Sequence, residues 1–239
     1  LDKDSDAWFT LGVILSKQEK DAESIEAYKR SISLNTEDAE LCYNLAVKLG
    51  ERGDRSSECD MYSKAVATDP DMGGAWLNWG TTLAEQSLLD DAESKFLRAL
   101  ATSSLIVKAK AMVNLGLVYY AKSTQYAASN KLPLAKETVD KAKHHLETAL
   151  PLLESAAKDS SGSNDIQSYL SQYKAMRMQV YRLTGQLFAG MGDLAASEQE
   201  FRDATSEFPN EKGAWFALAR VLDLRGKKDE AADLMSKFK

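Results

Sequence analysis

The two histidines of the chain, His144 and His145, are the first candidates for metal binding or acid–base chemistry. They are adjacent, and adjacent residues on a helix point about 100° apart, so the two imidazoles cannot ligate one metal ion together. His144 and Glu147 are three residues apart and share a helix face, but one pair supplies too few ligands. We therefore predict no metal site, and a solvated helix face at this point.

No other set of side chains predicts catalysis. The sequence contains no Gly-rich phosphate loop, no Gly-x-Ser-x-Gly turn and no pattern of a Cys/His/Asp triad. Cys42 and Cys59 form neither a Cys-x-x-Cys pair nor a disulfide framework. The carboxylates are scattered in a way that is typical of surface pairing with lysine on helices. We predict that the chain is not an enzyme, has no catalytic residue and needs no cofactor.

The overall charge limits the classes of partner. A chain with a net charge of -6 lacks the excess of basic residues that binds a phosphate backbone, so we predict no nucleic-acid partner. No apolar run is long enough to span a bilayer, so we predict no direct membrane insertion. We expect a soluble, cytoplasmic protein. Because the chain begins at Leu1 rather than Met, an organellar location after removal of a targeting peptide is the alternative.

The elements that carry these residues are predicted by a repeat. A small residue recurs along the chain, with a large residue four positions before it and another three positions after it. The first, second and last spacings between the small residues are 34 residues, and the third is 36. These small residues are Gly12, Ala46, Gly80, Gly116, Gly185 and Ala219.

The second half of each unit repeats as well. A large residue lies three positions before a second recurring position, which is Ala65 in the second unit and Ala204 in the fifth. Pro70 and Pro209 follow these two alanines by five residues, where a helix is expected to end. The large residues are Tyr28, Tyr62, Phe96, Leu146, Phe201 and Met235.

This pattern resembles the tetratricopeptide repeat family, most closely at residues 73–104, which contain Trp76, Gly80 and Phe96. The resemblance implies an all-α, right-handed superhelical solenoid of antiparallel helix pairs, with about 12 helices in one domain, residues 1–239. The expected units are 5–38, 39–72, 73–104, 105–158 with an insertion, 165–210 with an extended first helix, and 211–239.

Details of the units are predicted too. Gly53, Gly192 and Gly226 share one repeat position, which suits a helix end with positive φ, and an aspartate follows the first two as a helix cap.

Units four and five are long. We predict helices at roughly 105–130, at 134–150 with an extension that Pro151 starts and that reaches 158, and at 165–190, with a loop at 159–164. A hidden, degenerate repeat is the alternative.

In the family, the first helices of the units line a concave groove. At one such repeat position, three successive units of this chain have an asparagine: Asn44, Asn78 and Asn114. An asparagine amide both donates and accepts hydrogen bonds, so it can hold a peptide backbone. Arg182, Gln186 and Arg220 lie in the last two units and are predicted to pair with an acidic group. The remaining predicted partner-binding residues, most of them apolar, are Phe9, Val13, Tyr43, Val47, Leu77, Thr81, Val113, Leu117 and Tyr120.

The resemblance therefore implies a protein–protein interaction module that binds a protein or peptide segment in this groove. The C-terminal tail of Hsp70 or Hsp90 is not the expected partner, because the basic residues of such a clamp are missing. One alternative is a structural or assembly subunit that is permanently embedded in a large complex. A second is a substrate-recognition arm of a larger enzyme. The groove could also be filled by a segment of the same protein.

Overall fold

The computed structural model describes residues 4–35, 37–159 and 164–236, and within these ranges the chain is helical, with twelve helices and no strand. The residues group into two compact units, 1–111 and 112–239, which are described separately. The all-helical repeat architecture predicted from the sequence is confirmed. The interpretation of residues 1–239 as one domain stays a prediction, and residues 160–163 of the predicted loop lie outside the described residues.

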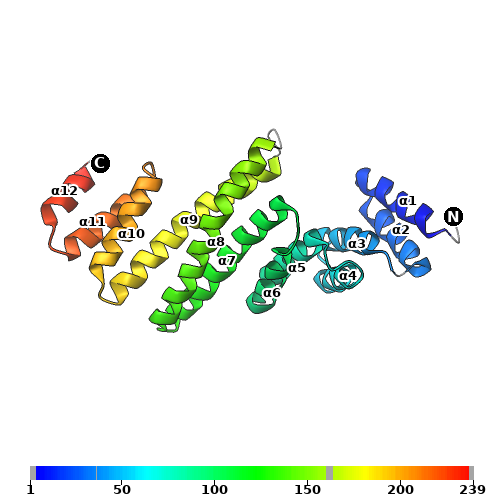
Figure 1. Cartoon of the computed structure of the whole chain (residues 1–239), viewed down its shortest axis with the longest axis horizontal. Helices are drawn as coiled ribbons and strands as arrows, with labels where there is room; N and C mark the ends of the chain where they lie inside the picture. Colours follow the sequence, from blue (N-terminus) through cyan, green and yellow to red (C-terminus); the bar gives the residue numbers. More distant parts are fainter. Residues whose placement is uncertain (1–3, 36, 160–163, 237–239) are drawn as a thin grey trace. The chain divides into compact units, whose positions relative to one another are not determined.

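The first unit consists of three helix pairs and the beginning of α7 (Figure 1). The two helices of each pair pack along each other, and α2 and α4 also pack against the first helix of the following pair. The helices are α1 (Ser5–Lys17), α2 (Asp21–Leu34), α3 (Ala39–Glu51), α4 (Arg55–Thr68), α5 (Gly73–Glu85), α6 (Leu89–Ala99) and α7 (Leu105–Ala128).

The second unit contains the rest of α7 and five further helices. Each helix from α8 to α11 packs on the next one along the chain, and the last of these contacts is between α11 and α12. Helix α7 packs on α8, since the Ser123 hydroxyl donates to the carbonyl of Ala135 at 2.6 Å. The helices are α8 (Leu132–Asp159), α9 (Asn164–Gly190), α10 (Leu194–Glu207), α11 (Lys212–Leu224) and α12 (Lys228–Ser236).

The recurring small residue is the point at which the two helices of a pair approach each other. A Cβ added to Gly80 would lie 2.7 Å from the ring of Phe96, and one added to Gly185 would lie 2.6 Å from the ring of Phe201. In the first and fifth units a buried serine bridges the same contact. Ser197 Oγ donates to the carbonyl of Gly185 at 2.7 Å, as Ser24 does to Gly12 at 2.8 Å. The repeated small and large positions therefore exist because the large side chain of the second helix packs directly on the backbone of the first helix at the small residue.

The same turn joins the first and second helix of all six units. One residue in each turn has positive φ, and the amide three positions beyond the last helical residue bonds back to the last turn of the helix, which is a Schellman motif. The six amide-to-carbonyl bonds, each 2.9–3.0 Å long, are Lys20 to Leu15, Asp54 to Leu49, Leu88 to Leu83, Lys131 to Tyr126, Asp193 to Phe188 and Lys227 to Leu222. The positive-φ residues are Glu19, Gly53, Ser87, Asn130, Gly192 and Gly226. Asp54 and Asp193 cap the following helix, as predicted.

The prediction of long helices in the middle of the chain is confirmed, with one correction. Helices α7, α8 and α9 have 24, 28 and 27 residues, and no additional helix pair occurs among the described residues. Pro151, however, does not start an extension, because it lies inside the continuous helix α8. A proline removes one backbone hydrogen bond, and the buried residues Ala149, Leu153 and Ala156 hold the helix on both sides of it.

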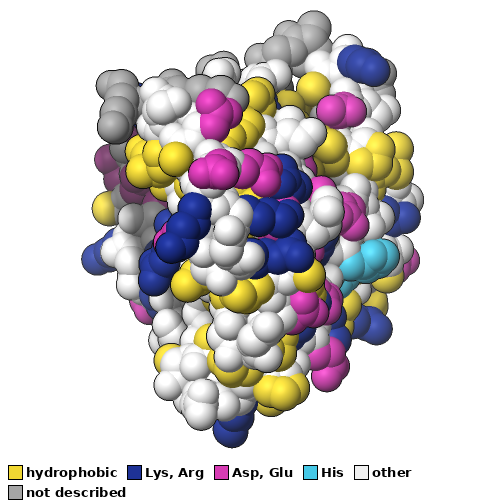
Figure 2. Space-filling view, turned by 90° about the vertical axis from the view of Figure 1, so that its left-hand side faces the viewer, with side chains coloured by type: hydrophobic (Ala, Val, Ile, Leu, Met, Phe, Trp, Pro, Cys, Tyr) yellow, Lys and Arg dark blue, Asp and Glu magenta, His cyan; other side chains and the backbone are white. Residues whose placement is uncertain are grey.

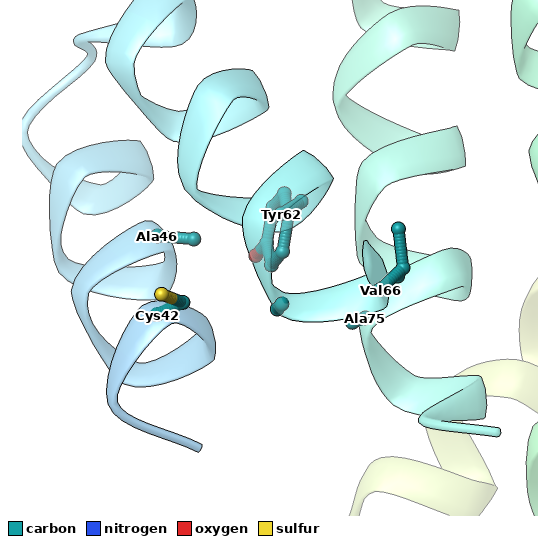
Figure 3. Close-up of a cluster of buried hydrophobic side chains, with 6 residues drawn as sticks. Cys42, Ala46, Tyr62, Val66 and Ala75 are labelled. Atoms are coloured by element: carbon teal, nitrogen blue, oxygen red, sulfur yellow. The ribbon is translucent and has the colours of Figure 1, made fainter. Parts of the chain in front are cut away.

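The core is a chain of local clusters between neighbouring helices. In the first unit, Cys42 and Ala46 on α3 face Tyr62 on α4, with Val66 and Ala75 beside them (Figure 3). Burial raises the pKa of the Tyr62 hydroxyl above its ordinary value, and the nearby carboxylate of Glu58 raises this pKa further. Because each cluster connects only adjacent helices, the stability of this fold is built from neighbour contacts.

Candidate functional site: the faces of the first helices

In the first unit, predicted site residues surround a hollow between α3, α4 and α5. Val47 on α3 and Asn78 and Thr81 on α5 line this hollow, which has a volume of about 190 Å³. Tyr62 and Glu58 of α4 complete its wall. Three of the predicted partner-binding side chains thus lie on one hollowed face.

Glu58 gives this hollow a buried carboxylate. Only 4% of the residue is exposed. Its carboxylate accepts hydrogen bonds from the Thr82 hydroxyl at 2.7 Å and from Arg55 Nη1 at 2.9 Å. Arg55 also pairs with Glu85 at 2.6 Å, so one arginine bridges two carboxylates at the rim. The corresponding position holds Ser24, Ala92, Ser197 or Ala231 in other units, so the periodicity did not single out Glu58.

The predicted asparagines lie in different surroundings. The side-chain amide of Asn78 donates to the Tyr43 hydroxyl at 3.1 Å, so one of its two N–H groups is engaged within the chain. Asn44 is half-buried on the same helix as Tyr43 and Val47. Asn114 belongs to the second compact unit and is only 8% exposed. Of the three predicted asparagines, therefore, Asn44 and Asn78 reach the surface.

Three of the predicted groove residues are buried, which corrects the sequence analysis. Val113 is 0% exposed, Leu77 is 6% exposed, and Asn114 is 8% exposed. The repeat position defines a direction from the helix axis, but side chains at the edge of a helix face also meet the neighbouring packed helix, which covers them. Phe9, Val13, Tyr43, Val47 and Thr81 are half-buried, and Phe9 and Val13 pack on the core cluster around Tyr28.

In the second unit, Arg182 and Gln186 on α9 and Arg220 on α11 are exposed. They border two hollows between these helices. Gln186 and Arg220 line one of about 390 Å³, and Arg182 lines one of about 240 Å³. On α7, Leu117 is exposed and Tyr120 is half-buried, with its hydroxyl 3.5 Å from Gln179 Oε1 of α9. The structure thus brings the predicted basic residues to one apolar-floored groove.

A second buried carboxylate, Glu198 on α10, ties the last three helices together. It is 4% exposed and accepts hydrogen bonds from Arg202, Arg225 and Lys227. Burial alone would raise the pKa of Glu198, but the bonds from these cations outweigh it and lower the pKa to about 2. Figure 2 faces the end formed by α10 to α12 and shows Lys and Arg side chains gathered beside Asp and Glu side chains.

Arg177 forms a third polar junction, between α8, α9 and α10. It is 6% exposed. Its guanidinium lies 3.1 Å from Glu147 and 3.4 Å from Glu207, and it donates to the Tyr181 hydroxyl at 3.0 Å. The Tyr181 hydroxyl in turn donates to Glu207 at 2.8 Å. Sequence reasoning missed Glu58, Glu198 and Arg177. The sequence did show the short spacings of Arg55 with Glu58 and of Glu198 with Arg202.

The two histidines differ in their surroundings, since His144 is exposed and His145 is half-buried. The ring of His145 stacks on Tyr119 with centroids 5.4 Å apart. Among the residues that the structure describes, no group of three or more His, Cys, Asp or Glu is arranged to hold a metal ion. In the same ranges, no helix combines the length and the apolar character needed to cross a bilayer.

Comparisons with known proteins agree with the repeat geometry. Family models described as tetratricopeptide repeat match residues 5–38 and residues 182–238, the two ends of the helical array. Both matched segments are therefore tetratricopeptide repeats. No curated protein sequence matches the chain significantly.

Solved structures show the same fold. The crystal structure of MamA protein has a TM-score of 0.53 and 17% identity, over 84% of this chain and 90% of MamA. A second MamA crystal structure gives a TM-score of 0.51 at 17% identity, over 82% of this chain and 92% of that one. The structure of PilF of Pseudomonas aeruginosa gives a TM-score of 0.50 at 17% identity, over 98% of this chain and 90% of PilF. At this identity the similarity shows the fold alone.

Proposed function

We propose that this protein is an interaction scaffold that binds a partner segment on the faces of its first helices. The observation that carries the proposal is the α3/α5 face, where Val47, Asn78 and Thr81 line a hollow beside Tyr43 and Asn44. Apolar side chains there supply burial for a partner's side chains. The amides of Asn44 and Asn78 supply donors and acceptors for a partner's backbone.

The composition of this face favours an extended segment of a protein over a small molecule. The hollow of about 190 Å³ is smaller than the pockets that usually enclose a ligand. Its lining mixes polar and apolar side chains from two successive first helices, α3 and α5, which suits a chain that binds at several successive points. Proteins that recognise peptides commonly combine backbone hydrogen bonds with pockets for side chains.

The test begins with the full chain and a random dodecapeptide library displayed on phage. Peptides selected by the wild-type protein are synthesised, and their Kd values are measured by fluorescence anisotropy with the Asn44→Ala/Asn78→Ala/Val47→Ser variant. We expect at least about tenfold weaker binding, because two backbone contacts and one apolar contact are lost.

The matched control is Glu26→Ala/Lys29→Ala on the exposed surface of α2, which leaves the α3/α5 face intact. Circular dichroism checks that all variants keep their helical content. If no peptide is enriched, or if selected peptides bind the face variant and the control equally well, the first-helix faces are not the binding surface and the proposal is wrong.

A further inference from the structure

Two arginines in the second unit differ from the others in having no carboxylate partner. Arg177, Arg202 and Arg225 each pair with at least one glutamate. Arg182 donates only to the neutral side-chain oxygen of Gln179, and Arg220 forms no ion pair among the described residues. Both are exposed, and both lie on the groove between α9 and α11. The groove thus carries two positive charges that the chain itself does not neutralise.

The groove floor between these two arginines is largely apolar. The two hollows share Phe201 and Ala217 as a common wall. Gly185 and Val221 add to the larger hollow, of about 390 Å³. Phe201 itself is only 4% exposed, so it forms the base of the groove rather than its rim. Side chains of moderate size can therefore enter on either side of Ala217.

We propose that the α9/α11 groove recognises an acidic segment of a partner protein. Two of the segment's carboxylates pair with Arg182 and Arg220, and its apolar side chains enter the hollows beside Ala217. This inference rests on the proposed scaffold function and names the chemistry of the partner. A guanidinium matches a carboxylate with two parallel hydrogen bonds, which fixes orientation as well as attraction. Arg182 would exchange the neutral acceptor of Gln179 for a charged one, and charge-assisted bonds are the stronger kind.

The charges around the groove restrict how an acidic segment binds. Glu211 lines the smaller hollow, so a carboxylate pairs with Arg182 at the rim while an apolar group takes the space below. Asp223 borders Arg220 on the side away from this groove, in a separate hollow. The chain has a net charge of -6, which repels an acidic segment elsewhere. The two arginines therefore determine where on the chain an acidic segment binds.

The experiment uses the full chain and two fluorescein-labelled dodecapeptides. One alternates glutamate with leucine, and the other has glutamine at every glutamate position. Anisotropy titrations measure Kd for the wild-type protein and for Arg182→Gln/Arg220→Gln. We expect the glutamate peptide to bind the wild-type protein more tightly than the glutamine peptide, and the double variant to lose at least about tenfold for the glutamate peptide alone.

The control variant is Arg52→Gln/Lys64→Gln, which removes the same charge from exposed positions of the first unit. Its affinity for the glutamate peptide should stay within twofold of wild type, roughly the effect of screened, distant charges. Equal affinity for both peptides, or equal loss in the two double variants, overturns the acidic-segment proposal. That outcome leaves the scaffold function standing if library peptides still depend on Asn44 and Asn78.

Discussion

The carboxylate of Glu198 provides a direct test of how the last helices are held together. The pKa of about 2 lies below the ordinary 4.5, so the folded protein stabilises the charged form. A difference of this size corresponds to about 3 kcal/mol of unfolding free energy. Arg202 and Lys227 are 39% and 41% exposed in their side chains, so solvent screens part of the interaction. We therefore expect Glu198→Gln to lower the unfolding free energy by about 1–2 kcal/mol at pH 7.

The pH dependence has a definite sign. The folded pKa is depressed, so the stabilisation is fully present above the unfolded value near 4.5 and is lost as the pH falls through the folded value of about 2. The unfolding free energy of the wild-type protein should thus exceed that of Glu198→Gln at pH 7, and this difference should shrink between pH 5 and pH 2. Urea unfolding followed by circular dichroism at pH 7, 4 and 2.5 measures the difference. Hydrogen exchange at pH 7 should place the loss in residues 194–236.

Asp203→Asn is the matched control, because Asp203 lies on the same helix and accepts a hydrogen bond from the neutral amide of Gln199. It should change the unfolding free energy by less than about 0.5 kcal/mol at every pH. A Glu198→Gln effect that is constant from pH 7 to pH 2.5 would refute the reasoning, because the loss would then come from packing rather than from the charge.

Two further predictions follow from the packing. Gly185→Ala should destabilise the protein by about 1–3 kcal/mol, because the new Cβ would lie 2.6 Å from the Phe201 ring. Gly213→Ala should be neutral or slightly stabilising, since nothing lies within 4 Å of its Cβ. Thermal unfolding compares the two, and equal effects would contradict the close-approach argument. Arg177→Ala should cost about 3 kcal/mol, because it leaves Tyr181 and Glu207 without their shared cation. Arg177→Met should cost less because it keeps the volume. A larger loss in the Met variant than in the Ala variant, measured by urea unfolding, would show that the junction is not held by packing and charge as described.

The sequence was sufficient for the architecture because the contacts that define it are local and repeated. Gly80 and Phe96 come from the two helices of one unit, and their spacing recurs along the chain, so the period reveals the close approach. Gly53, Gly192 and Gly226 revealed three of the six turns. Glu19 and Ser87 adopt the same positive φ without a glycine, because the surrounding helix pair fixes the turn whatever residue occupies it.

The tertiary structure alone decided which side chains remain open and which charges meet. The repeat predicted a common groove position for Leu77 and Val113, but neighbouring helices bury both, since exposure depends on what covers a helix face and not on its period. Glu198 meets Arg225 and Lys227 of the turn between α11 and α12, 27 and 29 residues along the chain. Such pairs do not recur from unit to unit, so no period in the sequence records them. They form only when the helices are packed.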